Sequence, residues 1–308
     1  MPPSVRRFVE DRLGARVLNA STPSGGFSPG VASILSLNNG DRTFLKAIPS
    51  SSPRAYMHKR EGELTAKFTP DVPSPRLRFA VTIDEWEVLC FDVAEGRLPE
   101  QPWRREDLTR VLAAADDLAR LLTPSPRSAL PPAETLLEEL FNHWEQARRT
   151  GVVRGTRVED LPKPLAVQVA HLAEVEEGWR ESVAGETLLH GDLRFDNILI
   201  SEENVAFVDW AWPSVGANWM DVVTFLPTVH QVDADLEALF LSTEVGRNAD
   251  QAKVNACLVA LAGMWTFHAR DPAPQHAPHL RALQRASGLA TLRWLVQRGV
   301  LPELGEGF

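Results

Sequence analysis

The sequence predicts an α+β chain with a small β-rich N-terminal lobe, residues 1–95, and a larger, mainly helical C-terminal lobe, residues 96–308. Two patterns predict it. Short β runs separated by turns fill the first third, and apolar residues at helical spacing dominate after about residue 100. The composition, 44% hydrophobic and 24% charged, is that of a globular protein long enough for two cores.

In the N-terminal lobe, amphipathic spacing predicts a helix at residues 5–14 and another at residues 55–68. Alternating apolar runs around residues 31–35 and 43–49 predict strands. The stretch "FDVAEGRLPEQP", residues 91–102, is the predicted boundary between the lobes.

In the C-terminal lobe, apolar residues recur with a helical period from Leu108 to Leu122. The stretches 133–149 and 164–183 are also predicted to be helical, and further helix signals occupy the last 70 residues. The proline-rich segment 123–132 joins helices within this lobe.

Composition and charge argue against several classes of protein. No window holds the roughly 18 apolar residues of a membrane span, so we expect no membrane partner and a cytoplasmic location. Cys90 and Cys257 both lie in apolar segments, which favours buried thiols over a disulfide. Residues 96–308 carry 20 basic and 30 acidic side chains, which argues against nucleic acid and mildly favours a cationic partner. The alternative is that the acidic surface only aids solubility. We expect a monomer or a homodimer.

The short β runs "NILI" and "VAFVDW", joined by the polar turn "SEEN", predict a hairpin at residues 197–210. If Ile200 pairs with Val205, antiparallel pairing brings Asn197 opposite Val208 and next to Asp209. An amide and a carboxylate would then meet at the open end of the hairpin.

Asp192 lies five residues before Asn197, in a predicted loop, so we expect it at the same edge as Asn197 and Asp209. Oxygen ligands of this kind suit Mg²⁺, which takes one or two protein ligands together with substrate phosphates. One carboxylate would remain to act as a base. The alternative is that each residue only caps a turn, as Asp and Asn often do.

Lys46 lies in the strand "TFLKAI", on the same face as Phe44 and Ile48. An ammonium group there is costly without an anionic partner, and Glu61 on the next helix is the natural candidate, ahead of Glu63. The alternative is a solvent-facing lysine on an edge strand.

Upstream, the glycine-containing turn "SGGFSPG" between β runs can aim backbone N–H groups at phosphate oxygens. Alone it is weak evidence, because many hairpins have glycine turns without a ligand and no Walker motif follows. The residues proposed for this contact are Ser24, Gly25, Gly26, Phe27 and Ser28.

The blocks "HGDLRFDNIL…VAFVDWAWPSVGANWMDVV" and "KREGELTAKFTPDVPSPRL" resemble the aminoglycoside phosphotransferase family of small-molecule kinases. The resemblance spans about residues 20–225 and implies the bilobal protein-kinase-like fold. By this resemblance Asp192 is the base that orients the substrate hydroxyl, and Asn197 and Asp209 hold Mg²⁺. Lys46 contacts the α- and β-phosphates and pairs with Glu61.

The resemblance further implies that the loop at residues 24–28 covers the triphosphate and that His190 and Asp221 brace the catalytic loop. The chain departs from the family at Ala211, where many relatives carry an acid. It also departs at Arg194, which replaces the protein-kinase lysine and could touch the γ-phosphate or pair with Asp196.

We therefore expect an ATP- or GTP-dependent, Mg²⁺-requiring kinase that phosphorylates a hydroxyl of a small molecule. The first candidate for this substrate is an aminoglycoside-like or other antibiotic. Asp233, Asp235 and Glu237 could bind a cationic amino sugar, or could equally begin a helix with a solvated face. The alternatives are a metabolic kinase for an amino alcohol, a sugar or homoserine, and a catalytically silent nucleotide-binding module.

Overall fold

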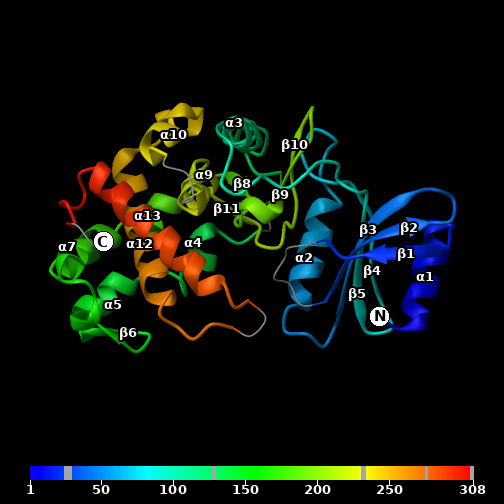
Figure 1. Ribbon diagram of the computed structural model, residues 1–308, viewed down its shortest axis with the longest axis horizontal. Helices are drawn as coiled ribbons and strands as arrows, with labels where there is room; N and C mark the ends of the chain where they lie inside the picture. Colours follow the sequence, from blue (N-terminus) through cyan, green and yellow to red (C-terminus); the bar gives the residue numbers. More distant parts are fainter. Residues whose placement is uncertain (24–29, 127–129, 230–233, 275–276, 306–308) are drawn as a thin grey trace. The chain divides into compact units, whose positions relative to one another are not determined.

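The structure is a computed structural model of the chain, and it describes residues 1–23, 30–126, 130–229, 234–274 and 277–305. The chain divides into two compact units (Figure 1). The first contains Met1–Pro99 and Phe195–Pro213, and the second contains Glu100–Arg194 and Ser214–Phe308. The predicted α+β class, with strands concentrated at the N-terminal end and helices after it, is confirmed.

The first unit is built on an antiparallel sheet with the strand order β1-β2-β3-β5-β4. Its strands are β1 (Val17–Ser21), β2 (Val31–Leu37), β3 (Arg42–Pro49), β4 (Leu77–Ile83) and β5 (Trp86–Phe91). Helix α1 (Pro3–Leu13) packs Val5 and Val9 against a core that includes Leu45 and Val88. Helix α2 (Ala55–Thr65) contacts β3, β4 and β5.

Helices α1 and α2 cover opposite faces of this sheet (Figure 1). Gly62 of α2 lies so close to the sheet that an added Cβ would come 2.7 Å from the Leu89 side chain. Leu89 and Lys46 are paired across β5 and β3, so both point to the α2 side. Burying one face under each helix places Lys46 between the sheet and α2.

The predicted hairpin consists of β9 (Ile198–Ile200) and β10 (Val205–Phe207). It belongs to the first unit, because Arg97 and Ile200 exchange backbone hydrogen bonds of 3.0 and 2.8 Å and the Phe207 N–H donates to Pro73 at 2.7 Å. The sequence predicted a single lobe boundary near residue 96, which assigned the β9–β10 hairpin to the C-terminal lobe. The assignment of nucleotide binding and catalysis to separate lobes stays a prediction.

The second unit is mainly helical, and α12 and α13 make its most extensive helix pair. Its longer helices are α3 (Arg105–Leu121), α5 (His143–Thr150), α7 (Val169–Glu176), α12 (Gln251–His268) and α13 (Leu280–Gln297). The shorter ones are α4 (Ala133–Leu137), α6 (Lys163–Ala166), α8 (Trp179–Val183), α9 (Met220–Phe225), α10 (Leu236–Ser242) and α11 (Glu244–Asn248). The short strands are β6 (Val152–Val153), β7 (Thr156–Arg157), β8 (Thr187–Leu189) and β11 (Ser214–Gly216).

The two long helical stretches predicted in this unit are interrupted. Asn142 has a φ of 68°, in the left-handed region, and separates α4 from α5. Its side chain accepts a 2.7 Å hydrogen bond from Trp179 Nε1, so a tertiary contact secures the break. The stretch 164–183 is likewise divided among α6, α7 and α8. In the described part of the chain, none of the helices has the length and apolar character required to cross a membrane.

Candidate active site

Lys46 and Glu61 form the ion pair that the sequence predicted. Lys46 Nζ lies 2.7 and 2.8 Å from the two carboxylate oxygens of Glu61. The Lys46 side chain is 13% exposed and that of Glu61 is 4% exposed, whereas Glu63 points into solvent. Glu61 was therefore the correct choice of partner.

Asp209 is a second partner of the same ammonium group. Its Oδ1 lies 2.6 Å from Lys46 Nζ, and its side chain is 30% exposed, so this end of the pair opens outward. Asp209 has a φ of 65°, an unfavourable conformation for a residue with a side chain. The Ala211 N–H donates to the Asp209 carbonyl at 2.8 Å and closes the tight turn. The sequence did not predict the contact of Asp209 with Lys46.

The charges of this cluster are strongly perturbed by burial and by one another. Burial lowers the pKa of Lys46, but Glu61 and Asp209 together outweigh it and hold the pKa above its ordinary value. Burial raises the pKa of Glu61, and Lys46 opposes that shift. We take Lys46 as charged, since two carboxylates share it. Burial, followed by the nearby Lys46, lowers the pKa of His58 to about 4, so His58 is neutral at neutral pH.

Asn197 lies where the hairpin register predicted. Val205 pairs with Ile200, and the Val208 N–H donates to the Asn197 carbonyl at 2.9 Å, next to Asp209. Asn197 is 4% exposed and ends a 3₁₀ turn directly before β9. A buried amide and a partly exposed carboxylate on adjoining backbone are oxygen donors of the kind that Mg²⁺ prefers. The donor set fits this metal.

Asp192 belongs to the second unit and lies in the loop after β8, as predicted. The loop is held by Asp221, whose carboxylate accepts the backbone N–H of His190 at 2.8 Å and that of Gly191 at 3.0 Å. The Asp192 N–H contacts His190 Nδ1 at 3.3 Å. Gly191 has a φ of 78°, which a residue with a side chain rarely adopts.

Two further features concern the charge of this loop. Burial raises the pKa of Asp221, while the His190 side chain and the two N–H donors oppose the shift. Arg194 Nε lies 3.9 Å from Asp192 Oδ2, so a cation stands beside the candidate base.

The acidic residues that suggested a cationic acceptor have partners inside the second unit. Asp235 caps α10 by accepting the Ala238 N–H at 2.9 Å, and it also accepts a bond from Gln297 at 2.6 Å. Glu237 accepts bonds from Trp294 Nε1 and Arg298. These contacts support the alternative interpretation, a helix start. Asp233 and the predicted phosphate loop Ser24–Ser28 lie outside the described residues.

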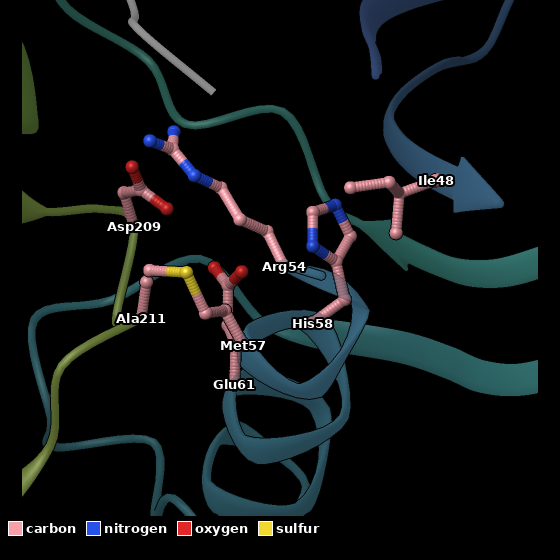
Figure 2. A pocket seen from close by; sticks show the side chains of 7 residues that line it. All are labelled: Ile48, Arg54, Met57, His58, Glu61, Asp209 and Ala211. Carbon is pink, nitrogen blue, oxygen red and sulfur yellow. The ribbon is translucent and has the colours of Figure 1, made fainter. Parts of the chain in front are cut away.

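A pocket opens beside Asp209 in the first unit (Figure 2). Arg54, His58 and Glu61 line it from α2 and the residue before it, and Asp209 and Ala211 line it from the segment after β10. Two apolar side chains complete the lining. The Lys46 cluster thus borders a small, partly open pocket whose lining combines charged and apolar side chains.

Comparison with protein families matches residues 20–254 to the phosphotransferase enzyme family. The chain belongs to this family. The enzyme class and the family predicted from the catalytic segment are thereby confirmed. A search of curated proteins found no match for this phosphotransferase.

Several solved structures have the same fold. An amicoumacin kinase, solved with AMP-PNP and Ca²⁺, is 11% identical over 95% of this chain and 96% of its own, with a TM-score of 0.57. A macrolide 2′-phosphotransferase from Brachybacterium faecium is 16% identical over 94% and 98%, with a TM-score of 0.55. A choline kinase from Cryptosporidium parvum is 13% identical over 92% and 91%, also with a TM-score of 0.55. At these identities the likeness supports the fold, and the predicted protein-kinase-like arrangement is confirmed.

Proposed function

We propose that this phosphotransferase moves the γ-phosphate of ATP or GTP to a hydroxyl group of a small molecule. The observation that carries the proposal is the Lys46 ammonium shared by Glu61 and Asp209 at the edge of a small pocket. A cation fixed by two carboxylates is oriented before the ligand arrives, which lowers the reorganisation that phosphate binding requires.

Lys46 would contact the nucleotide phosphates, and Glu61 would hold it in position. Asn197 and Asp209 would hold Mg²⁺, which supplies neutralisation of phosphate charge. With Asp209 holding the metal, Lys46 would keep Glu61 as its partner and would have donors left for phosphate. The residues Ser24–Ser28 are proposed to cover the triphosphate.

Asp192 would accept the proton of the acceptor hydroxyl. An aspartate of ordinary basicity suffices, because the hydroxyl loses its proton late in the loose transition state of phosphoryl transfer. Arg194, 3.9 Å from Asp192, would place a positive charge beside this carboxylate. The bonds from His190 and Gly191 to Asp221 would fix the loop that carries the base.

The acceptor is proposed to be an antibiotic hydroxyl, with a metabolic alcohol as the second class. The neighbours support both, since an amicoumacin kinase and a macrolide 2′-phosphotransferase stand beside a choline kinase. Asp235 and Glu237 have partners inside the second unit, so these two residues do not themselves argue for a cationic acceptor. Neutral hydroxyl compounds therefore belong in any screen together with aminoglycosides.

The test is release of nucleoside diphosphate by the purified protein with Mg²⁺ and ATP or GTP, across a panel of antibiotics, amino alcohols, sugars and homoserine. Acceptor-dependent release that is lost in Asp192→Asn supports the proposal. Tight nucleotide binding without turnover on any acceptor would instead indicate the silent nucleotide-binding module.

A further inference from the structure

The pocket beside Asp209 contains a cation that the roles above do not use. Arg54 immediately precedes α2, and its guanidinium is turned toward Asp209 (Figure 2). Arg54, His58 and Glu61 are spaced by four and three residues, so they share one face of the helix. The face of α2 that holds Lys46 through Glu61 thus also places Arg54, a second cation, at the pocket.

Arg54 makes the charge of the pocket more favourable for an anionic ligand. Glu61 and Asp209 bring two negative charges, Lys46 brings one positive charge, and His58 is neutral. Without Arg54 these groups would oppose an anionic ligand. Arg54 brings the sum to neutrality before any metal binds.

Arg54 is also available for a ligand. It is exposed, and in the described part of the chain no carboxylate forms an ion pair with its guanidinium. The acidic residues that line the pocket are Glu61 and Asp209, and both bind Lys46. Ala211 adds only a methyl group to the lining. A planar guanidinium fits phosphate oxygens two at a time.

We propose that Arg54 binds the terminal phosphates of the nucleoside triphosphate, next to the metal held by Asp209. The proposal rests on the proposed function, which supplies the ligand. Arg54 lines the same pocket as Asp209, the residue that would hold the metal and so neutralise phosphate charge. Arg54 would therefore add to the affinity for a triphosphate and contribute little to that for a monophosphate.

The experiment measures equilibrium binding of Mg²⁺·AMP-PNP, Mg²⁺·ADP and AMP by titration calorimetry, without turnover. The variants are Arg54→Gln, which removes the charge, and Arg54→Lys, which keeps the charge but cannot bind two phosphate oxygens in the planar guanidinium geometry. Lys67→Gln is the matched control, because it removes one exposed cation just after the other end of α2. Thermal melting confirms that each variant is folded.

We expect Arg54→Gln to weaken binding of Mg²⁺·AMP-PNP by about 10- to 100-fold, the worth of a charge-assisted hydrogen-bond pair. Binding of ADP should weaken less, AMP should be unaffected, and Arg54→Lys should fall between Arg54→Gln and the wild type. If Arg54→Gln binds all three nucleotides with the affinities of Lys67→Gln, the role assigned to Arg54 is overturned and the proposed function still stands. Equal weakening for all three would also overturn this role. A wild type that binds none of them would overturn the proposed function and this inference together.

Discussion

In the first unit the carboxylates of Glu61 and Asp209 share the Lys46 ammonium, whereas in the second unit Asp221 accepts backbone N–H groups of His190 and Gly191. A side-chain cation can exchange one partner for a ligand. Backbone donors are fixed by the course of the chain and hold a loop in one conformation. The difference suggests that removing a carboxylate should mainly impair ligand binding in the first unit and folding stability in the second.

Glu176 is a second example of the backbone-held kind. It is 1% exposed and accepts the Glu145 N–H at 2.9 Å, at the start of α5. Burial raises the pKa of Glu176 to about 7, because the accepted N–H groups do not replace the lost water. The partners described for Glu176 are backbone N–H groups and include no cation that would correspond to Lys46 of the first unit.

The largest effect is expected for Asp192. This carboxylate belongs neither to those that share Lys46 nor to those that accept backbone N–H groups. Asp192→Asn should lower kcat by about 10²- to 10⁴-fold, as for loss of a general base. Nucleotide affinity should stay within a few-fold of the wild-type value, because the base contacts the acceptor. Steady-state kinetics and calorimetry test both, and near-wild-type kcat would remove Asp192 from the mechanism.

Asp209→Ala should impair binding and catalysis together, by about 10²- to 10³-fold in kcat/KM, because a metal ligand and a partner of Lys46 are lost at once. The affinity for Mg²⁺·AMP-PNP should fall in a Mg²⁺ titration, while the urea midpoint changes little. If the metal dependence stays at the wild-type value, Asp209 serves only the turn.

Lys46→Ala should stay folded by circular dichroism and lose most of its kcat/KM, about 100-fold. Removing one partner of a fully buried pair costs about 3–5 kcal/mol, and the opening at Asp209 makes the loss of stability smaller here. Glu61→Ala should show a milder loss, because Lys46 can still reach phosphate without its orienting partner, and the exposed Glu63→Ala is the control. A damaging Glu63→Ala beside a silent Glu61→Ala would contradict the pairing.

Asp221→Ala should act on the fold instead, because it leaves two N–H groups of the loop without their acceptor. We expect a loss of about 2–4 kcal/mol in the free energy of unfolding, measured with urea. Asp221→Asn keeps one acceptor oxygen and should lose less. A stable Asp221→Ala protein with selectively weakened nucleotide binding would break the distinction between the two units.

The smallest effect is expected for the pH dependence at Glu176. A carboxyl with a raised pKa binds its proton more tightly in the folded state, so its contribution is complete below pH 4.5 and is lost as the pH rises through about 7. Between pH 5 and pH 8, wild type should therefore lose about 2–3 kcal/mol of stability relative to Glu176→Gln. The exposed Glu177→Gln is the control, and parallel curves for wild type and Glu176→Gln would contradict the assignment.

Local patterns carried much of this account from the sequence alone. Alternation and helical spacing located β2, β3 and α3, and the hairpin register followed from Ile200 and Val205. The Lys46–Glu61 pair followed from one physical argument, the cost of an ammonium group on an apolar strand face.

What the sequence could not supply depends on residues far apart in the chain. Lys46 and Asp209 are separated by 163 positions, and each already had a predicted partner or role, so nothing local indicated their contact. The break at Asn142 depends on Trp179, 37 residues later. Glu237 binds Arg298, 61 residues away, a contact that the acidic character of its own stretch does not indicate.

The most direct test of the central claim is phosphorus NMR of the wild-type protein incubated with Mg²⁺, ATP and the acceptor that gives the highest diphosphate release. The account predicts a new phosphate-monoester signal that grows as the γ-phosphate signal declines, with one ADP formed per ester and no ester in Asp192→Asn. Inorganic phosphate as the sole product, or an unchanged ATP spectrum with every acceptor of the panel, would contradict it.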